Sequence, residues 1–375
     1  MKSFHPTPKT LMGPGPSDVP TRILEAMARP TVGHLDPQFI ALMDEIKTLL
    51  RFAFQTENAL TFPVSAPASA GMETCFVNLV EPGDSVVVCV NGVFGGRMVE
   101  NVTRAGGTAI VVQNEWGTPV DPQMVEETLK AHPEAKILAF VHGETSTGVL
   151  SDAKALCALA REHDALSIVD AVTSLGGVEV LVDEWGVDAI YSGTQKCLSV
   201  PPGLSPISFG PRAIAAIEAR VSPVQSWFLD LSLVMNYWEG ATPKSKARSY
   251  HHTAPINAMY ALHEGLLMLH EEGLKAAFAR HQTQHEHLRD GLEALGFSFL
   301  VEPEYRLPPL NTVRIPERIS DEATIRKNLL ENHDLEIGAG LGALAGKVWR
   351  IGLMGASACP KNVDKCLSAL KQELG

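Results

Sequence analysis

The sequence predicts an α/β protein with a large domain built on a buried, mostly parallel sheet, followed by a smaller α+β domain. Between about residues 57 and 210, short apolar and β-branched runs alternate with amphipathic stretches. Runs that are apolar throughout are typical of strands covered by helices on both faces, and such strands are usually parallel. From about residue 260 the pattern changes to long helical stretches and then to short strands.

Each element of this fold has its own signal in the sequence. The N-terminal segment is rich in Pro and Gly, which delays the first helix to about Thr21. The large domain is predicted to contain strands at 85–90, 109–112, 137–141, 166–169 and 189–191, with helices at 121–131 and 152–164. The small domain is predicted to contain helices over 255–295, strands near 297–302, 311–315 and 347–353, and a last helix over 361–373. We therefore divide the chain into an N-terminal arm (1–20), a large domain (21–260) and a small C-terminal domain (261–375).

Composition and charge exclude several classes of protein. Hydrophobic residues make up 45% and charged residues 20% of the chain, which is typical of a globular protein. The formal net charge is −12 and no run of five basic residues occurs, which argues against a nucleic-acid surface. No segment approaches the ~20 apolar residues that span a bilayer, and the N-terminus lacks an apolar signal core. We expect a cytoplasmic protein that binds neither nucleic acid nor membrane.

The cysteine pattern agrees with a reducing compartment. None of the cysteines forms a CxxC pair, and most lie in apolar surroundings. We interpret all six as reduced residues and not as a disulfide framework or a zinc site. They are Cys75, Cys89, Cys157, Cys197, Cys359 and Cys366.

Polar residues follow three of the predicted strands directly. The segments HGETSTG, DAVTSLGG and SGTQK, which begin at His142, Asp170 and Ser192, each come after an apolar run. Ligands of parallel sheets bind beyond the carboxyl ends of the strands. We therefore expect a hydroxyl cluster, a carboxylate and an amine to meet at one edge of the sheet.

Asp170 and Lys196 suit the chemistry of pyridoxal phosphate. A lysine partly removed from water has a lowered pKa and becomes a nucleophile toward a carbonyl carbon. A carboxylate beside a pyridine nitrogen keeps that nitrogen protonated, and the protonated ring is a strong electron sink. Taken singly, Asp170 can equally be a strand-end cap and Lys196 a surface lysine. Their joint placement favours the cofactor.

Three further segments carry candidate anion-binding groups. Ser69 precedes an apolar helical stretch at 72–80, where backbone N–H groups would face an anion, although an ordinary helix cap has the same pattern. Tyr250 and Thr253 flank two adjacent histidines. Adjacent histidines rarely bind one metal ion, whereas the hydroxyls of Tyr250 and Thr253 can contact a phosphate. Arg350 lies in an otherwise apolar strand, where burial requires a partner, either a substrate carboxylate or an acidic side chain.

Together these segments resemble the alanine–glyoxylate and serine–pyruvate aminotransferases of the class V, fold-type I pyridoxal phosphate enzymes. The resemblance covers nearly the whole length. It includes LMGPGPSDVP at 11–20, HLDP at 34–37, LVEPGDSVVV at 79–88, YSGTQKCLSVPPG at 191–203, YHHTAP at 250–255 and VWRIGLMG at 348–355. It implies a large domain with a mostly parallel seven-stranded sheet, a smaller C-terminal α+β domain, and a homodimer with composite active sites.

The resemblance also implies roles for single residues. Lys196 would bind the coenzyme covalently and move a proton between Cα and C4′, and Asp170 would pair with the pyridine nitrogen. Arg350 would take the substrate α-carboxylate, with Gly15 beside it. The remaining cofactor-binding residues would be Pro67, Ala68, Ser69 and Gln195 at the phosphate, Phe94 and Val172 on the two ring faces, Thr145 near the 3′ oxygen, and Tyr250 and Thr253 from the neighbouring subunit.

One segment departs from the family's pattern. Relatives usually have Gly-Thr-Gly or Gly-Ser-Gly where this chain has Ala66-Pro67-Ala68. Proline removes a backbone donor, and alanine resists the positive φ that glycine tolerates. We expect a shallower or differently shaped phosphate cup, with weaker cofactor binding or an unphosphorylated pyridoxal substrate as possible consequences. The intact Tyr250–Thr253 segment favours pyridoxal phosphate.

We predict ping-pong transamination with alanine or serine as the amino donor and glyoxylate or pyruvate as the acceptor. Ureidoglycine–glyoxylate and pyridoxamine–pyruvate aminotransferases are alternatives, although relatives that act on ureidoglycine usually have Gln where this chain has His34. A lyase or cysteine desulfurase with the same cofactor would need a nucleophilic cysteine, for which Cys359 is the candidate. An oxidoreductase on a doubly wound sheet is a further alternative, but the sequence has no GxGxxG motif after the first strand. A binding protein that has lost activity is the last alternative.

Overall fold

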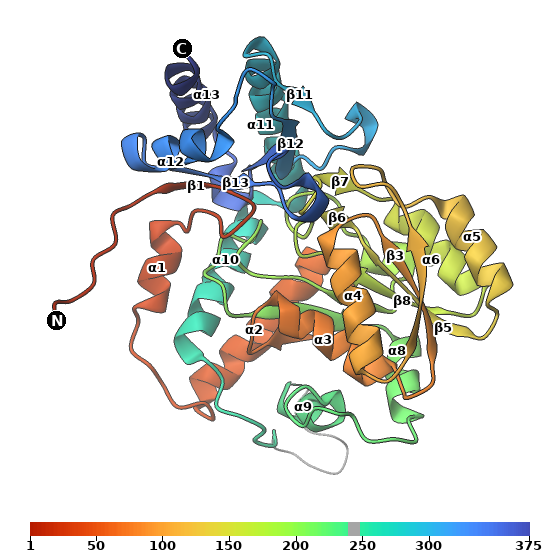
Figure 1. The fold of residues 1–375 in the computed structure, drawn as a ribbon. Helices are drawn as coiled ribbons and strands as arrows, with labels where there is room; N and C mark the ends of the chain where they lie inside the picture. Colours follow the sequence, from red (N-terminus) through yellow and green to blue (C-terminus); the bar gives the residue numbers. More distant parts are fainter. Residues whose placement is uncertain (239–247) are drawn as a thin grey trace.

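A seven-stranded sheet forms the centre of the large domain in the computed structural model, which describes residues 1–238 and 248–375 (Figure 1). The strand order is β2-β10-β9-β8-β5-β3-β4. The strands are β2 (Leu60–Val64), β3 (Ser85–Val90), β4 (Thr108–Gln113), β5 (Ala135–Val141), β8 (Leu166–Asp170), β9 (Ala189–Tyr191) and β10 (Ser205–Phe209). In this sheet β10 runs antiparallel to both of its neighbours, and the other six strands share one direction. The predicted mostly parallel sheet is confirmed.

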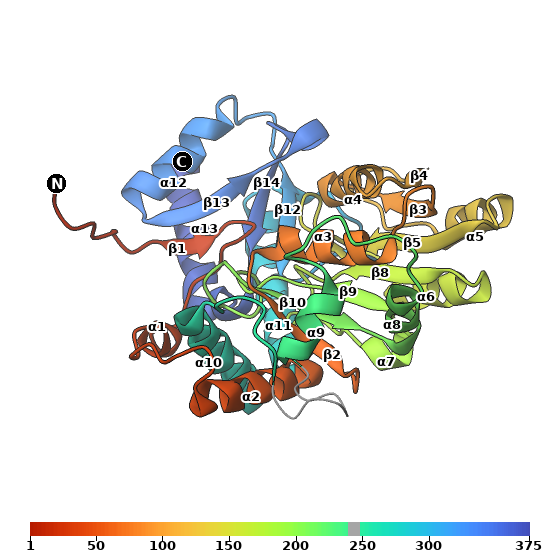
Figure 2. The same ribbon diagram turned by 90° about the horizontal axis from the view of Figure 1, so that it is seen from below.

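Helices cover both faces of this sheet. Figure 2 shows α3 and α4 on one face and α7 and α8 on the other. The helices of this part of the chain are α1 (Thr21–Met27), α2 (Pro37–Phe54), α3 (Ala68–Leu79), α4 (Val93–Arg104), α5 (Pro122–Ala131), α6 (Ala153–Glu162), α7 (Val182–Trp185), α8 (Pro211–Glu218), α9 (Leu231–Trp238) and α10 (Ile256–Glu272). Because both faces are covered, β3, β5, β8 and β9 are buried along nearly their whole length.

Several helices begin at a capping aspartate. Asp36, Asp121 and Asp152 precede α2, α5 and α6, and each side chain accepts a hydrogen bond from a backbone N–H of the first turn. In α2 and α5 the next residue is proline, which needs no hydrogen-bond partner at that position. These caps explain why α5 and α6 begin where the sequence predicts them.

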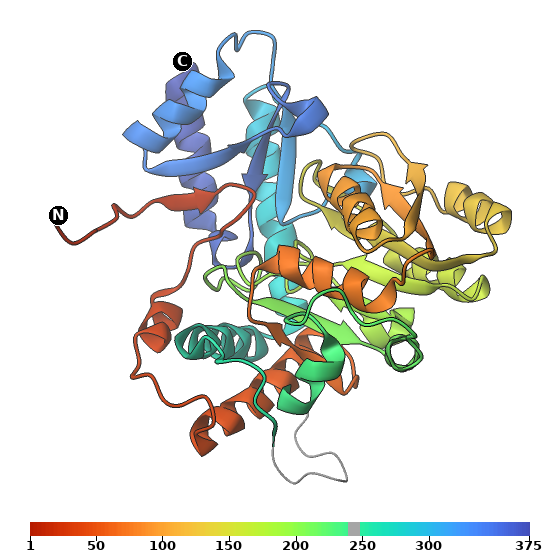
Figure 3. The same ribbon diagram turned by 60° about the horizontal axis from the view of Figure 1, so that its bottom comes forward.

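The small domain contains a five-stranded sheet with the order β1-β13-β14-β12-β11. Its elements are β11 (Ser298–Phe299), β12 (Leu310–Arg314), β13 (Leu335–Ala339), β14 (Val348–Gly352), α11 (Leu274–Ala294), α12 (Glu322–Asn332) and α13 (Pro360–Leu374). The remaining strand, β1 (Thr10–Met12), comes from the N-terminal arm and pairs in parallel with β13. One apolar cluster extends from Ile23 to Ala277, and a second joins Met12 to residues between Leu288 and Leu370. Helix α11 (cyan) runs between the two parts in Figure 3.

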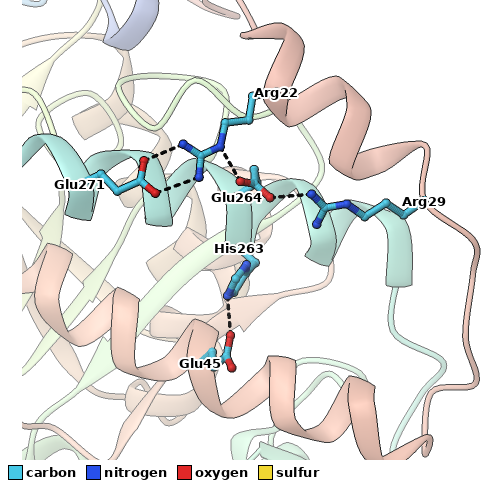
Figure 4. A network of polar contacts seen from close by, with 6 residues as sticks. All are labelled: Arg22, Arg29, Glu45, His263, Glu264 and Glu271. Carbon is cyan, nitrogen blue, oxygen red and sulfur yellow. Dashed lines mark hydrogen bonds and ion pairs between the residues drawn. The ribbon is translucent and has the colours of Figure 1, made fainter.

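Helix α1, which directly follows the arm, is fastened to α10 by polar contacts, and α10 is joined to α2 by a further contact (Figure 4). Arg22 of α1 bonds Glu264 at 2.6 Å and Glu271 at 2.6 and 2.9 Å, both on α10. Glu264, which is buried, also accepts from Arg29 at 3.0 Å. This network holds α1 in place, and the loop between β1 and α1 passes over the carboxyl edge of the large sheet.

Some elements differ from those predicted. Strands β2 and β10 contain Pro63 and Pro206, residues that argue against a strand because proline cannot donate to the ladder. They pair with each other so that the two prolines lie opposite. Helix α3 begins at Ala68, earlier than the apolar stretch predicts, since Pro67 serves as its N-cap. Within residues 1–238 and 248–375, no helix combines the length and apolar character that a membrane span needs.

Candidate active site

A cavity of about 190 Å³ lies at the carboxyl ends of β5, β8 and β9, the three neighbouring strands that the polar segments follow. It is lined by Pro67, Ala68, Ser69, Met72, Phe94, Arg97, Val141, Gly143, Thr145, Asp170, Val172, Tyr191, Gln195 and Lys196. The structure therefore brings Lys196 and Asp170 together with most of the residues that the resemblance implies for the cofactor.

Lys196 is nearly buried, with 8% of its surface exposed. Its Nζ donates a hydrogen bond to the carbonyl oxygen of Pro14 in the N-terminal arm. Burial, helped by the positive charge of Arg350, lowers the pKa of Lys196 to about 8. Gly15 follows directly, with a φ of +103°, and a Cβ there would lie 2.7 Å from Nζ. A glycine at this position thus lets the arm form one wall beside the amine.

Asp170 ends β8 and is 2% exposed. Its Oδ1 accepts a hydrogen bond from the Val172 N–H at 2.8 Å, and its Oδ2 accepts one from the Tyr191 hydroxyl at 2.7 Å. Burial raises the pKa of Asp170 to about 7, while the Tyr191 and Val172 hydrogen bonds act to lower it. The carboxyl group is therefore fixed in orientation and poised between its two protonation states near neutral pH.

Arg350 lies on β14 of the small domain and is 6% exposed. Its guanidinium donates to the carbonyl oxygens of Ala339 at 2.7 Å and Thr145 at 3.2 Å. Among the described residues no carboxylate forms an ion pair with it, so the alternative of a structural salt bridge finds no support. Burial lowers the pKa of Arg350 to about 10. Arg350 does not line the cavity itself, but its partner Thr145 does.

The rest of the cavity combines polar side chains with apolar walls. Phe94 and Val172 supply apolar surface, and the Thr145 hydroxyl bonds the Thr173 hydroxyl. The side-chain oxygen of Gln195 is buried without a hydrogen-bond partner in the part of the chain described. Donors for a phosphorylated aldehyde would instead be the Gln195 NH2 group, the Ser69 hydroxyl and the backbone N–H groups at the start of α3, all beside a lysine.

Tyr250 and Thr253 do not line this cavity. Both are exposed, and their hydroxyls lie 3.3 Å apart. The neighbouring His251 and His252 bond each other through Nδ1 at 2.8 Å, and His252 bonds Ser65 through Nε2 at 2.7 Å. Action of Tyr250 and Thr253 from a neighbouring subunit stays a prediction.

Sequence reasoning missed several residues that line or adjoin the cavity. Tyr191 is the register partner of Asp170 on the adjacent strand, so the shared strand ends were a usable signal. Met72 and Arg97 also line the cavity. The Arg97 guanidinium carbon lies 4.7 Å from the centre of the Phe94 ring, as expected for residues three apart on a helix.

A further missed residue is Glu144, a fully buried carboxylate that adjoins the cavity beside Thr145. Burial raises its pKa, although hydrogen bonds from Ser146, Phe94 and Gly95 act in the opposite direction. No cysteine lines the cavity, and Cys359 is instead the N-cap residue of α13. Among the described residues, no thiol lies in this cavity.

Several known proteins match nearly the whole chain. The family profile described as aminotransferase class-V matches residues 11–356. The (S)-ureidoglycine–glyoxylate transaminase of Bacillus subtilis (strain 168) is 39% identical, with 98% of this chain and 90% of that protein covered. The alanine–glyoxylate aminotransferase of Oryctolagus cuniculus is also 39% identical, with 98% and 92% covered. The crystal structure of alanine–glyoxylate aminotransferase from Nostoc sp. has a TM-score of 0.96 at 44% identity and covers 100% of this chain and 97% of that chain.

Proposed function

The chain belongs to the class-V aminotransferases, and on that premise we propose that it transfers the amino group of alanine or serine to glyoxylate or pyruvate, with pyridoxal 5′-phosphate as its coenzyme. The observation that carries the proposal is the pairing of a buried lysine and a buried aspartate across one cavity. The family depends on pyridoxal phosphate, and these two residues provide the amine and the carboxylate that this coenzyme requires.

The residues present fit the coenzyme. Asp170 would face its pyridine nitrogen, and Lys196 would hold its aldehyde carbon. Phe94 and Val172 would pack on the ring, and Ser69 and Gln195 would hold the phosphate, with Pro67 and Ala68 beside them. When bound, pyridoxal phosphate supplies the electron sink that makes a substrate Cα–H acidic.

The chain's own residues would carry the proton and the substrate. Lys196, with a pKa near 8, is partly neutral at physiological pH and can accept the Cα proton and return it. The Pro14 carbonyl orients Nζ from the side of the arm. Arg350 would bind the α-carboxylate through the guanidinium edge that Ala339 and Thr145 leave unused, since a carboxylate accepts two parallel hydrogen bonds.

Ureidoglycine is the second candidate donor. The Bacillus subtilis transaminase named for this substrate is as similar in identity as the rabbit alanine–glyoxylate enzyme. His34 is the residue by which the sequence distinguishes ureidoglycine from alanine or serine as the donor. The centre of its ring lies 5.0 Å from the centre of the Tyr250 ring. Alanine and serine are preferred because His34 differs from the glutamine usual in enzymes that act on ureidoglycine.

A homodimer with composite sites forms part of the proposal. Tyr250 is 58% exposed and Trp227 is 64% exposed, so both can meet a second copy. Tyr250 and Thr253 of one subunit would then complete the phosphate site of the other. We place the protein in the cytoplasm, since all six cysteines are free thiols.

Single-turnover half-reactions test the proposal. The protein is loaded with pyridoxal phosphate and mixed rapidly with alanine, serine, ureidoglycine, aspartate or cysteine, and the coenzyme absorbance is followed. Conversion to the amine form is expected to be fastest with alanine or serine and to reverse on addition of glyoxylate. Conversion by none of these donors would contradict transamination, and release of sulfide from cysteine would favour a desulfurase.

A further inference from the structure

Helix α4 begins without a capping side chain of its own. Its N-cap residue is Gly92, which has no side chain to bond the first turn. An α-helix leaves its first backbone N–H groups without partners inside the helix, and burying them unpaired is costly. Two residues from the segment after β5, Glu144 and Ser146, supply the missing acceptors.

Glu144 and Ser146 bond each other and the first backbone N–H groups of α4. The Val93 N–H donates to Oγ of Ser146 at 3.0 Å, and the Phe94 N–H donates to Oε2 of Glu144 at 3.1 Å. The other carboxylate oxygen of Glu144 accepts from the Ser146 N–H at 3.0 Å and its hydroxyl at 2.6 Å. Gly95 donates a further backbone hydrogen bond to Glu144. Every partner of the carboxylate is thus a donor, as an ionised carboxylate requires.

Gly92 provides the space that this arrangement needs. A Cβ at Gly92 would lie 2.4 Å from Cγ and Cδ of Glu144, closer than such atoms approach. The buried carboxylate therefore packs directly on the backbone at the start of α4. Such close packing leaves the start of α4 little freedom to shift relative to the segment that carries Glu144.

We infer that Glu144 is a positioning residue that holds Phe94 at a fixed distance from Thr145 across the cavity. Phe94 is the second residue of α4, and Thr145 directly follows Glu144, so both walls of the site are tied to one carboxylate. The inference rests on the proposed function, because Phe94 matters here as the wall against which the pyridoxal phosphate ring would pack.

A double-mutant cycle on coenzyme binding tests this role. The dissociation constant of pyridoxal phosphate is measured by absorbance for the wild type, Glu144→Gln, Phe94→Ala and the double variant. In Glu144→Gln the side-chain NH2 group would face backbone N–H groups that now donate to a carboxylate oxygen. The variant is therefore expected to bind pyridoxal phosphate about tenfold more weakly, which is the equivalent of one charge-assisted hydrogen bond. If Glu144 acts through Phe94, the same substitution has little further effect once Phe94 is alanine.

Two further variants complete the experiment. Glu100→Gln makes the same change on an exposed part of α4, where Glu100 contacts only Arg104 at 3.4 Å among the described residues, and it should leave binding unchanged. Ser146→Ala removes the Val93 acceptor and one donor to Glu144, and it replaces Glu144→Gln in the cycle if that protein does not fold.

The outcomes separate this inference from the proposed function. Coenzyme binding that weakens equally with and without Phe94 would overturn the positioning role, and so would binding that does not weaken at all. Absence of coenzyme binding in the wild type would overturn the proposed function as well. A loss confined to the background that retains Phe94 would support both.

Discussion

Tyr191 donates a hydrogen bond of 2.7 Å to Oδ2 of Asp170, and both side chains are buried at the carboxyl edge of the large sheet. The two residues are register partners on adjacent parallel strands, so the backbone pairing itself sets their distance. Burial favours the neutral carboxyl, while this hydrogen bond favours the carboxylate. Tyr191 therefore favours the charge that Asp170 would need opposite a pyridine nitrogen.

Substitution of Tyr191 by Phe is expected to raise the pKa of Asp170 further above about 7, because the hydrogen bond that lowers it is lost. The acid limb of the kcat/KM profile should then move to higher pH, since more of the free enzyme carries a protonated Asp170. Tyr237→Phe is the matched control, a buried tyrosine whose hydroxyl reaches only the His34 carbonyl, at 3.5 Å, in the described chain. An acid limb that stays in place in Tyr191→Phe would contradict this role.

Removal of the Arg350 guanidinium should weaken all α-amino acid substrates alike. We expect Arg350→Met to lower kcat/KM about 100-fold for alanine and serine, the loss of a charge-assisted bidentate contact worth about 3 kcal/mol. Arg350→Lys should recover only part of this, because an ammonium cannot make two parallel hydrogen bonds. Arg314→Met, an exposed arginine on the adjacent strand β12, is the control. Unchanged kcat/KM in Arg350→Met would show that another group binds the carboxylate.

Covalent attachment of pyridoxal phosphate should depend on pH through Lys196. Only the neutral amine attacks the aldehyde, so the attachment rate is expected to rise with pH around a midpoint near 8 and not near 10.5. In Arg350→Met the midpoint should move to higher pH, because loss of a nearby positive charge stabilises the ammonium form and raises the pKa of Lys196. Stopped-flow absorbance measures both rates. A midpoint that moves to lower pH, or stays in place, would contradict the coupling of the two residues.

The ion pairs that join α1 to α10 should stabilise the fold mainly through Glu264, their buried carboxylate. Glu264 and Glu271 both bond Arg22, but their side chains are 7% and 49% exposed. We expect Glu264→Gln to lower the free energy of unfolding by about 2 kcal/mol, because a buried carboxylate that accepts from two arginines is replaced by an amide whose NH2 group cannot accept. Glu271→Gln should cost less than Glu264→Gln, because solvent screens an exposed ion pair. Denaturant unfolding of the two variants measures the difference, and equal losses would show that burial does not decide the contribution.

Much of the fold, and the meeting of Asp170 and Lys196 at one cavity, can be predicted from the sequence. Five strands of the large sheet and the family membership are confirmed, because buried parallel strands are apolar throughout and the segments around Lys196 are distinctive. Strands β2 and β10 were missed because Pro63 and Pro206 oppose strand formation locally, and only their mutual pairing in the sheet permits them.

The parts of the site that the sequence does not reveal depend on tertiary contacts. Glu144 lies in a segment that we expected to contribute hydroxyls, and its partners on α4 are about 50 residues away in the chain. Arg97 lines the cavity, whereas Arg350, the carboxylate-binding group that the sequence indicates, does not line it. Gly15 reaches Lys196 only because β1 joins the small sheet and carries the arm across the site.

Chemical trapping tests the assignment of Lys196 most directly. The protein is incubated with pyridoxal phosphate, reduced with borohydride and digested, and the modified peptide is identified by mass spectrometry. We predict a stoichiometric phosphopyridoxyl group on Lys196, and none there in Lys196→Ala. A label distributed over surface lysines, or absent from the peptide that contains Lys196, would contradict the account.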